Sequence, residues 1–384
     1  MKVLIPLFKP AMGKEELKEV KKVLFSGWTG LGPKTQEFEE KFASFIGVKY
    51  AIGVSSGTAA LHLALRALDL KPSEEVISTA LTFVSTNHAI LYNRATPVFA
   101  DIYPDTLTLD VSDIRRKITS KTRVILPVHY GGHAVELDEI MELCRDKGIH
   151  LVEDAAHACG AKYRNRYIGS FGDMTCFSFH AVKNLSMGEG GMITTNNAKL
   201  YERIKKLRWM GIDKTTWERS GSKKAYSWQY TVDELGFKEH LDDIHSAIGL
   251  AQLAKLEKLN KRRRRIVSLY NEGLSKINWI KIPIEKPYVK SSYHLYVIQV
   301  PAILRDRLID YLAENGISTS VHYYPNHLFP VYQPYRVNLP ITEEIAKRIV
   351  SLPLYPALRD IQVEMVIDTI YSFSKKIKAN KKGL

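Results

Sequence analysis

The sequence has few cysteines and no long apolar run. Its 384 residues include only Cys144, Cys159 and Cys176, at unpaired spacings. An odd number without paired spacing argues against a disulfide framework and a zinc site, so we expect no metal. No stretch approaches the roughly 20 apolar residues of a membrane span. The N-terminal MKVLIPLFKPAMGKEEL has too short an apolar run for a secretory signal. We therefore expect a cytoplasmic protein without a membrane partner.

Acidic residues are the minority among the charged side chains. Lys and Arg number 55 against 41 Asp and Glu, a net charge of +14. Such an excess favours phosphorylated or polyanionic partners, and it also keeps a protein soluble. The cluster Lys261–Arg265 lies inside a long helical pattern from about residue 241 to 274. We interpret it as a solvated helix face rather than a nucleic-acid patch, so no nucleic-acid partner is expected.

Short apolar runs alternate with helical patterns from Tyr50 to Thr195. This alternation predicts an α/β domain with a mainly parallel seven-stranded sheet flanked by helices. Helical patterns fill most gaps, notably 57–69 and 136–147, whereas the gap 180–190 is too short for a crossover helix and allows an antiparallel last pair. The candidate strands are 50–54, 75–79, 97–101, 123–128, 149–153, 174–179 and 191–195.

The pattern changes after about residue 200. Residues 208–240 are rich in Gly, Trp, Lys and Ser with weak periodicity, which is typical of a functional or interface loop. The long helix follows, and after it come a strand at 294–300, a helix at 304–315, a proline-rich loop at 325–340 and two closing helices. We predict a large α/β domain over 1–250 and a smaller α+β domain over 251–384.

Polar residues occur at the carboxyl ends of several predicted strands, where ligands bind in open parallel sheets. Ser55–Thr58 begin a buried helix, either as a phosphate site or as an ordinary N-cap. Asp154 ends a strand, where its carboxylate either pairs with a pyridinium nitrogen or caps a helix. Lys183 follows about thirty residues later in a glycine-bounded loop, as an amine that could act as a nucleophile. Phe83 either packs in the core or stacks on a flat ring.

Several segments, in this order and spacing, resemble the DegT/StrS family of sugar aminotransferases. These enzymes use pyridoxal 5′-phosphate (PLP) and have fold type I. The likeness covers nearly the whole chain, from SGWTGLGPKTQEFEEKFASFIG to SLPLYP, and implies amino transfer from glutamate to a nucleotide-linked keto-sugar. The segments that carry it are SSGTAAL, TFVST, EDAAHACGA, FSFHAVKN and GEGGMITT.

The resemblance also assigns roles to individual residues. Lys183 forms the Schiff base with PLP and moves the proton, and Asp154 pairs with the pyridine nitrogen. His157 lies near the ring hydroxyl, where many relatives have Gln, and Phe83 stacks on the ring. The residues assigned to the cofactor phosphate are Gly57, Thr58 and Ser178.

Two further histidines match motifs of the family. His240, in GFKEHLDDI, resembles the residue that reaches the cofactor phosphate from the partner subunit, which implies a homodimer with shared active sites. Glu239 departs from the aromatic residue that is commoner there. His322, in VHYYPNH, resembles a substrate-side histidine.

Other functions compete with this interpretation. Related sugar dehydratases replace the lysine by histidine, whereas this chain keeps Lys183 and has His180 nearby. A fold-type-I enzyme for amino or keto acids would need an arginine for the substrate carboxylate, and Arg208 is the candidate by sequence order. A non-catalytic regulatory or nucleic-acid-binding protein has only the net charge in its favour.

The position of amination is predicted to be C4 of a 4-keto-sugar. Lys and Arg residues along 205–224 suit a substrate that carries a diphosphate. Family members that act at C3 tend to carry Asn-Ser-Arg where this chain has Phe237-Lys238-Glu239.

Overall fold

A seven-stranded sheet forms the centre of the larger part of the molecule, which a computed structural model describes over residues 5–220 and 228–381. The order of its strands is β1-β9-β8-β5-β4-β2-β3. Strands β3, β2, β4, β5 and β8 run parallel, and β9 is antiparallel to both of its neighbours, as the short gap before it allowed. The strands are β1 (Tyr50–Val54), β2 (Glu75–Thr79), β3 (Thr96–Ala100), β4 (Thr122–Leu126), β5 (His150–Asp154), β8 (Met174–Ser178) and β9 (Gly191–Thr195). Each overlaps a predicted strand, so the predicted fold class is confirmed.

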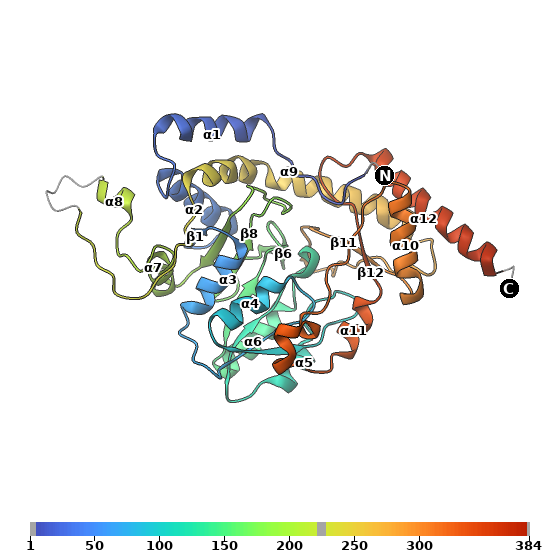
Figure 1. Cartoon of the computed structure of the whole chain (residues 1–384), viewed down its shortest axis with the longest axis horizontal. Coiled ribbons are helices and arrows are strands. Elements are labelled where there is room, and N and C mark those ends of the chain that lie inside the picture. The colour runs from blue at the N-terminus through green and yellow to red at the C-terminus, as the bar shows by residue number, and fades with distance from the viewer. Residues whose placement is uncertain (1–4, 221–227, 382–384) are drawn as a thin grey trace.

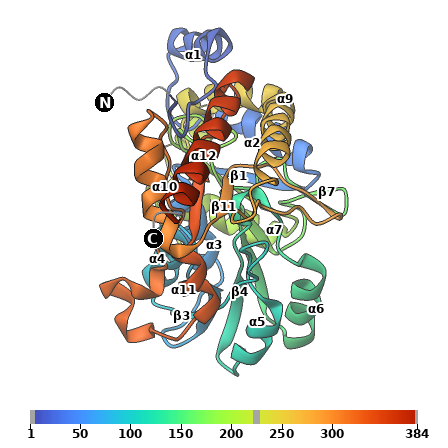
Figure 2. The same ribbon diagram turned by 90° about the vertical axis from the view of Figure 1, so that its right-hand side faces the viewer.

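Helices cover both faces of this sheet (Figures 1 and 2). Successive strand residues point to opposite faces, so Ile77 and Ile125 pack against one helical layer and Val76 and Val124 against the other. The first layer comprises α2 (Pro33–Ile46), α5 (Val111–Lys117), α6 (Leu137–Lys147) and the first part of α9 (Asp243–Leu274). The second comprises α3 (Gly57–Arg66), α4 (Val84–Tyr92) and α7 (Ala198–Leu207).

The C-terminal part has its own core. The antiparallel strands β11 (Tyr296–Gln299) and β12 (Ile349–Leu352) pack with α10 (Ala302–Glu314), α12 (Asp360–Lys381) and the second part of α9. This is the smaller α+β unit that the sequence predicted. Because α9 carries Leu256 in the core of the sheet and Tyr270 in the C-terminal core, the proposed boundary at residue 250 falls inside one continuous helix.

Helix α1 (Lys14–Ser26) and several shorter elements complete the fold. Helix α1 packs on α9 away from the sheet, at the top of Figure 1. No helix within residues 5–220 or 228–381 is long and apolar enough to cross a membrane. The remaining elements are β6 (Lys162–Tyr163), β7 (Arg166–Tyr167), β10 (Val289–Lys290), α8 (Thr216–Ser220), α11 (Pro340–Ala346) and the 3₁₀ turns η1 (Tyr130–Gly132), η2 (Asn326–Leu328) and η3 (Pro330–Tyr335).

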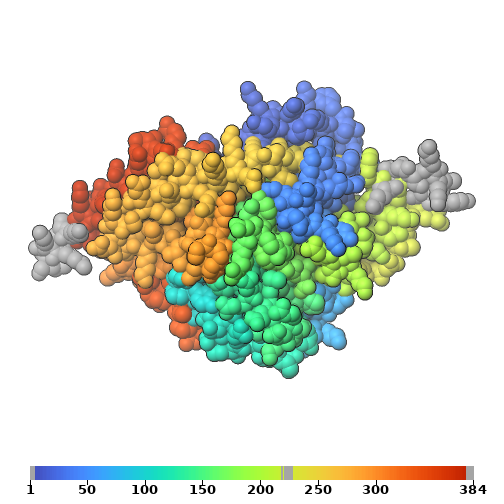
Figure 3. Space-filling model, turned by 180° about the vertical axis from the view of Figure 1, so that it is seen from behind, coloured from blue at the N-terminus to red at the C-terminus, as the bar shows by residue number. Residues whose placement is uncertain are grey.

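The interpretation of Lys261–Arg265 as a solvated helix face is wrong for part of the cluster. Five consecutive residues cover every side of a helix, because each is rotated by about 100° from the last. Lys261 and Arg265 are exposed on α9, which lies along the surface in Figure 3. Arg263 faces inward, where its Nη1 donates to the carbonyl of Leu354 at 2.9 Å, and burial lowers the pKa of its guanidinium to about 10.

Candidate active site

A cavity of about 400 Å³ lies at the carboxyl ends of strands β5 and β8. Strand ends, helix starts and a loop of the C-terminal part together line it. All of the predicted site residues except His240 contribute, although they are far apart in the sequence. They are Gly57, Thr58, Phe83, Asp154, His157, Ser178, Lys183 and His322.

The start of α3 forms an anion cradle on one side of the cavity. Ser56 caps the helix, and its Oγ accepts the N–H of Ala59 at 3.0 Å. First-turn N–H groups have no partner within a helix, so those of Gly57 and Thr58 are left to bind a ligand. A side chain on Gly57 would bring its Cβ within 2.6 Å of the Cβ of Ser178, so only glycine lets β8 approach this closely.

Asp154 is a buried carboxylate whose two oxygens each accept one hydrogen bond from the protein. Thr86 Oγ1 donates to Oδ2 at 2.7 Å, and the N–H of Ala156 donates to Oδ1 at 3.0 Å. Burial raises the pKa of Asp154, and these two donors together with Lys183 oppose the rise. A cation beside this carboxylate would stabilise its ionised form.

Lys183 lies in the loop between β8 and β9. Burial lowers the pKa of its amine to about 8, and the negative charge of Asp154 partly opposes this change. An amine with this pKa is partly neutral at physiological pH, as a nucleophile must be. Lys183 and Asp154 thus place a reactive amine and an electrostatic anchor in one cavity.

Two more predicted residues complete the walls. The ring of Phe83 is 56% exposed and lies 6.2 Å from the ring of Tyr323, so one face of it is free to cover a flat ligand. Nδ1 of His322 lies 2.8 Å from Ser351 Oγ, which leaves Nε2 for the cavity. Burial and the charge of Lys183 lower the pKa of His322 to about 4, so its imidazole is neutral.

These residues fit the cofactor that the sequence predicted. PLP has a phosphate, a pyridine nitrogen and an aldehyde, which need an anion cradle, a carboxylate and an amine. The start of α3, the Asp154 carboxylate with its raised pKa and the Lys183 amine supply these three groups. Phe83 supplies an uncovered ring for the pyridine face.

His240 lies outside the cavity of its own chain. It pairs with the end of β1 through a bridge to Val54, and its ring packs edge-on against Trp209 at 4.5 Å. Its Nδ1 is buried and has no hydrogen-bond partner within the described residues. The unusual neighbour Glu239 pairs with Nδ1 of His62 on α3 at 2.9 Å, which ties this segment to the helix that forms the cradle.

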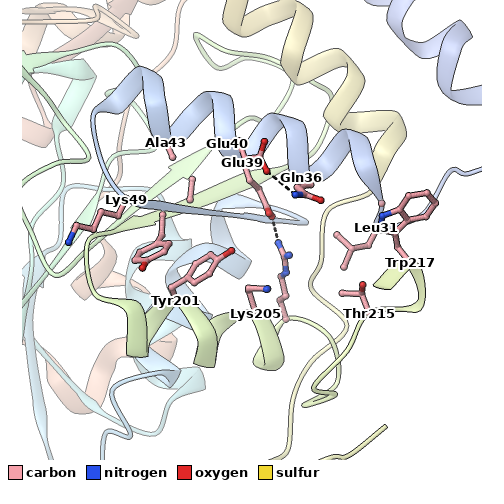
Figure 4. A pocket seen from close by; sticks show the side chains of 14 residues that line it. Leu31, Gln36, Glu39, Glu40, Ala43, Lys49, Tyr201, Lys205, Thr215 and Trp217 are labelled. Carbon is pink, nitrogen blue, oxygen red and sulfur yellow. Dashed lines mark hydrogen bonds and ion pairs between the residues drawn. The ribbon is translucent and has the colours of Figure 1, made fainter. Parts of the chain in front are cut away.

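Arg208 does not point into the site. It lines a separate cavity of about 210 Å³ beside α2, β1 and α7, which Figure 4 shows. Its Nη1 donates to the carbonyl of Gly53 at 2.7 Å and forms an ion pair with Glu39, which itself accepts the N–H of Gly53 at 2.7 Å. In Figure 4 the side chain of Glu39 reaches from α2 toward this edge of the sheet. The side chains of Arg208 and Glu39 thus form hydrogen bonds with the backbone of the edge strand β1.

Among the lining residues that were not predicted, three contact or lie next to predicted ones. Thr86 lies in the TFVST motif, one turn after Phe83, where a hydroxyl can reach the neighbouring strand end. Tyr323 follows His322, and its hydroxyl lies 3.0 Å from His157 Nε2. His294 lies in the SSYHLYVI motif, and its ring packs 4.4 Å from that of His157. Their motifs are visible in the sequence, but nothing local indicates which side chain faces the cavity.

Comparisons with known proteins agree with this geometry. The DegT/DnrJ/EryC1/StrS aminotransferase family matches residues 10–371. The chain is 41% identical to the spore coat polysaccharide biosynthesis protein SpsC of Bacillus subtilis over 97% of both chains. The PLP form of Spr1654 from Streptococcus pneumoniae superposes with a TM-score of 0.90 at 32% identity, over 97% of this chain and 99% of that one. The sugar aminotransferase CalS13 from Micromonospora echinospora gives 0.88 at 33% identity, over 96% and 100%. The chain therefore belongs to the DegT/DnrJ/EryC1/StrS aminotransferase family.

Proposed function

We propose that this protein uses PLP to transfer the amino group of glutamate to C4 of a nucleotide-linked 4-keto-sugar. Its general activity, without the donor and the position of amination, is that of a PLP-dependent sugar aminotransferase of the DegT/DnrJ/EryC1/StrS family. The observation that carries the PLP chemistry is the Lys183 amine, whose pKa is lowered to about 8 in the same cavity as the Asp154 carboxylate and the start of α3.

The described residues supply binding and electrostatics for this chemistry. PLP, when bound, supplies the electron sink for the pair of electrons left on the substrate carbon. Asp154 holds a proton on the ring nitrogen, and Thr86 and Ala156 keep its carboxylate in place. The N–H groups of Gly57 and Thr58 bind the phosphate, while Phe83 covers one face of the ring.

Lys183 performs the proton transfer in this proposal. Its Nζ takes a proton from the amino donor's carbon and returns one on the cofactor side, and the reverse sequence aminates the sugar. An amine with a pKa of about 8 accepts and releases protons readily near neutral pH. His322 presents a neutral imidazole, which suits a hydrogen bond to an uncharged hydroxyl of the sugar.

The acceptor assignment rests on charge and on the family motifs. A net charge of +14 suits a substrate with a diphosphate, because cationic clefts concentrate anions. Within the predicted cationic stretch, Lys206 pairs with Asp233 and Arg208 with Glu39, and residues 221–224 lie outside the described part of the chain. The Phe237-Lys238-Glu239 sequence is the second support for C4.

The competing functions receive less support. An enzyme whose acceptor is a free keto acid would be expected to hold that acceptor's carboxylate with an arginine in the cavity, and within the described residues none lines it. Arg208, the one candidate, is buried against Glu39. For a nucleic-acid-binding protein, the basic cluster on α9 is an incomplete patch, because Arg263 is buried within the protein.

We also propose a homodimer in which each subunit completes the other's site. His240 lies outside its own cavity and its side chain is only partly buried, so its imidazole is available to a partner's cofactor phosphate. Exposed apolar residues lie on α1 and on the segment that leads to His240, as expected of a surface that a second copy covers. They are Leu17, Leu24, Phe25, Met210, Trp228, Tyr230, Val232 and Leu235.

The test of the reaction is direct. The enzyme is incubated with glutamate and either 4-keto or 3-keto nucleotide-sugars, and the new C–N bond is located by NMR. We expect an amine at C4. Amination confined to C3, or activity on free keto acids alone, would defeat the proposal.

A further inference from the structure

His157 and Tyr323 form a hydrogen-bonded pair in the wall of the cavity. His157 Nε2 lies 3.0 Å from the Tyr323 hydroxyl, and the two rings stack with centroids 6.1 Å apart at 17°. His157 comes from the turn after β5, whereas Tyr323 comes from the C-terminal part of the chain. The predicted roles gave His157 the contact with the ring hydroxyl of PLP and gave Tyr323 none.

The backbone fixes the direction of this hydrogen bond. The N–H of Gly131 donates to His157 Nδ1 at 3.3 Å, so Nδ1 is the unprotonated nitrogen. Burial lowers the pKa of His157 well below its usual range, so the imidazole is neutral and its single proton is on Nε2. This N–H therefore donates to the Tyr323 oxygen. The hydroxyl proton of Tyr323 therefore does not point at His157 and is available to another acceptor.

Among residues 5–220 and 228–381, no other protein group accepts that proton. Within the described residues, His157 is the only hydrogen-bond partner of the Tyr323 hydroxyl. Burial raises the pKa of Tyr323, so the phenol stays protonated over the physiological range. None of the hydrogen bonds of the neighbouring polar groups involves the Tyr323 hydroxyl: Tyr130 donates to the His322 carbonyl, Nδ1 of His322 pairs with Ser351, Nδ1 of His294 pairs with Asn184, and Asp154 accepts from Thr86 and Ala156. Lys183 lines the same cavity, and its charge acts on His157.

The geometry of PLP leaves one polar atom for this wall. The phosphate and the ring oxygen lie on opposite sides of the carbon that bears the aldehyde, and the ring nitrogen lies across the ring from that carbon. In the proposed function, α3, Asp154 and Lys183 take the phosphate, the nitrogen and the aldehyde carbon. The ring oxygen then faces away from α3, and His157 and Tyr323 form a polar wall of the same cavity.

We infer that Tyr323 donates its O–H to the ring oxygen of bound PLP, and that His157 is a positioning residue that acts through Tyr323. This inference rests on the proposed placement of the cofactor. It reassigns the contact with the ring oxygen from His157 to its neighbour. Tyr323 touches the cofactor in this arrangement. His157 donates to the Tyr323 oxygen, and this leaves the hydroxyl hydrogen of Tyr323 directed into the cavity.

The inference has a spectroscopic consequence. The high-pH form of the lysine-bound cofactor carries more negative charge on the ring oxygen than the low-pH form does. A donor to this oxygen stabilises the high-pH form and so lowers the pH at which the visible absorption band changes. Removal of the Tyr323 hydroxyl should raise this midpoint by about one pH unit or more, the scale of shift produced by hydrogen bonds to a charged group.

The experiment is a pH titration of the visible band of the holoenzyme. We expect Tyr323→Phe to raise the midpoint, and His157→Gln, which keeps an N–H donor, to raise it less. Tyr324→Phe is the matched control, because Tyr324 is 56% exposed and its ring contacts Phe329 rather than the cavity. Its midpoint should equal that of the wild type. A Tyr323→Phe midpoint equal to the wild type would overturn the inference.

A cofactor analogue separates hydrogen bonding from general damage. The apoenzymes are titrated with PLP and with 3-deoxypyridoxal 5′-phosphate, which lacks the ring oxygen. We expect Tyr323→Phe to weaken PLP binding about tenfold and to leave the analogue's dissociation constant unchanged. Equal weakening for both ligands would mean a structural role and would refute the inference. If wild-type protein gives no visible band with PLP, the proposed function fails instead.

Discussion

At the scale of single residues, Lys183 has the environment of a reactive amine. Burial lowers its pKa to about 8, so about a tenth of the amine is neutral at pH 7, far more than at the ordinary pKa. We predict that the rate at which PLP bonds to the apoenzyme rises with pH through a midpoint near 8, because only the neutral amine attacks the aldehyde. Stopped-flow absorbance between pH 6 and 10 measures it. A midpoint close to that of free lysine would contradict the prediction.

Lys183→Ala is the control for that measurement. It should fold, bind PLP without a covalent bond and show no turnover, because a loop lysine contributes little to the core. Borohydride reduction of the wild-type holoenzyme should label Lys183. Labelling of another lysine would show that the reactive amine has been assigned wrongly.

Asp154 is the second residue whose environment decides its role. We predict that Asp154→Asn retains PLP but loses activity on the order of 100-fold, because a neutral amide cannot hold a proton on the ring nitrogen. Asn still offers an acceptor to Ala156, so the local fold should persist. Because the charge of Asp154 raises the pKa of Lys183, the midpoint for PLP attachment should also move below 8. Activity within a few-fold of wild type would contradict the assigned role.

At the scale of elements, the contact between the start of α3 and β8 limits which residues can form the cradle. We predict that Gly57→Ala weakens PLP binding about tenfold or more, because its Cβ would lie 2.6 Å from the Cβ of Ser178 and the strand must move. Gly30→Ala is the matched control, since a Cβ there meets nothing within 4 Å. Dissociation constants from PLP titration of both apoenzymes measure the effect. Equal affinities would show that the cradle tolerates the shift.

Most elements were predictable because each strand is buried and bounded by polar turns. The run 75–79 and strand β2 coincide, and the long helix predicted from 241 is α9 from Asp243 to Leu274. The helix predicted over 57–69 ends at Arg66, since Asp69 has a φ of 51° that no helix continues through. The basic cluster was misjudged because sequence periodicity over five like charges does not show which one faces inward.

At the scale of the whole molecule, the site depends on contacts that local sequence does not encode. His157 and Tyr323 are 166 positions apart in the chain and meet because the C-terminal part closes over the sheet. The family resemblance indicated His322 in that loop but not its neighbour. For Arg208 the sequence was misleading. Its place in the chain predicted a position near the site, but in the fold its side chain pairs with Glu39. Motifs thus indicated the residues at the strand ends of the cavity, but only His322 among those that the C-terminal part contributes.

The assembly of subunits determines whether one chain makes a complete active site. His240 is fixed to the end of β1 by the bridge to Val54, and the neighbouring Glu239 is anchored to His62, so the segment is held in place although His240 does not line its own cavity. A homodimer with two-fold symmetry would bring each His240 to the other subunit's phosphate site. His240→Ala alone should then weaken PLP binding and activity without changing the cavity residues of its own chain.

Mixed dimers test this arrangement. A Lys183→Ala protomer has no amine but an intact His240, and a His240→Ala protomer has the reverse. In a mixed dimer with shared sites, one site carries both substitutions and the other carries neither, so random mixing should restore about a quarter of the wild-type sites. Activity is measured after the two variants are unfolded together and refolded, with differently tagged chains to prove that mixed dimers form, and it is compared with the activity of each variant alone. Mixed dimers with no more activity than the separate variants would mean that each site is built within one chain, because neither protomer could then supply what the other lacks.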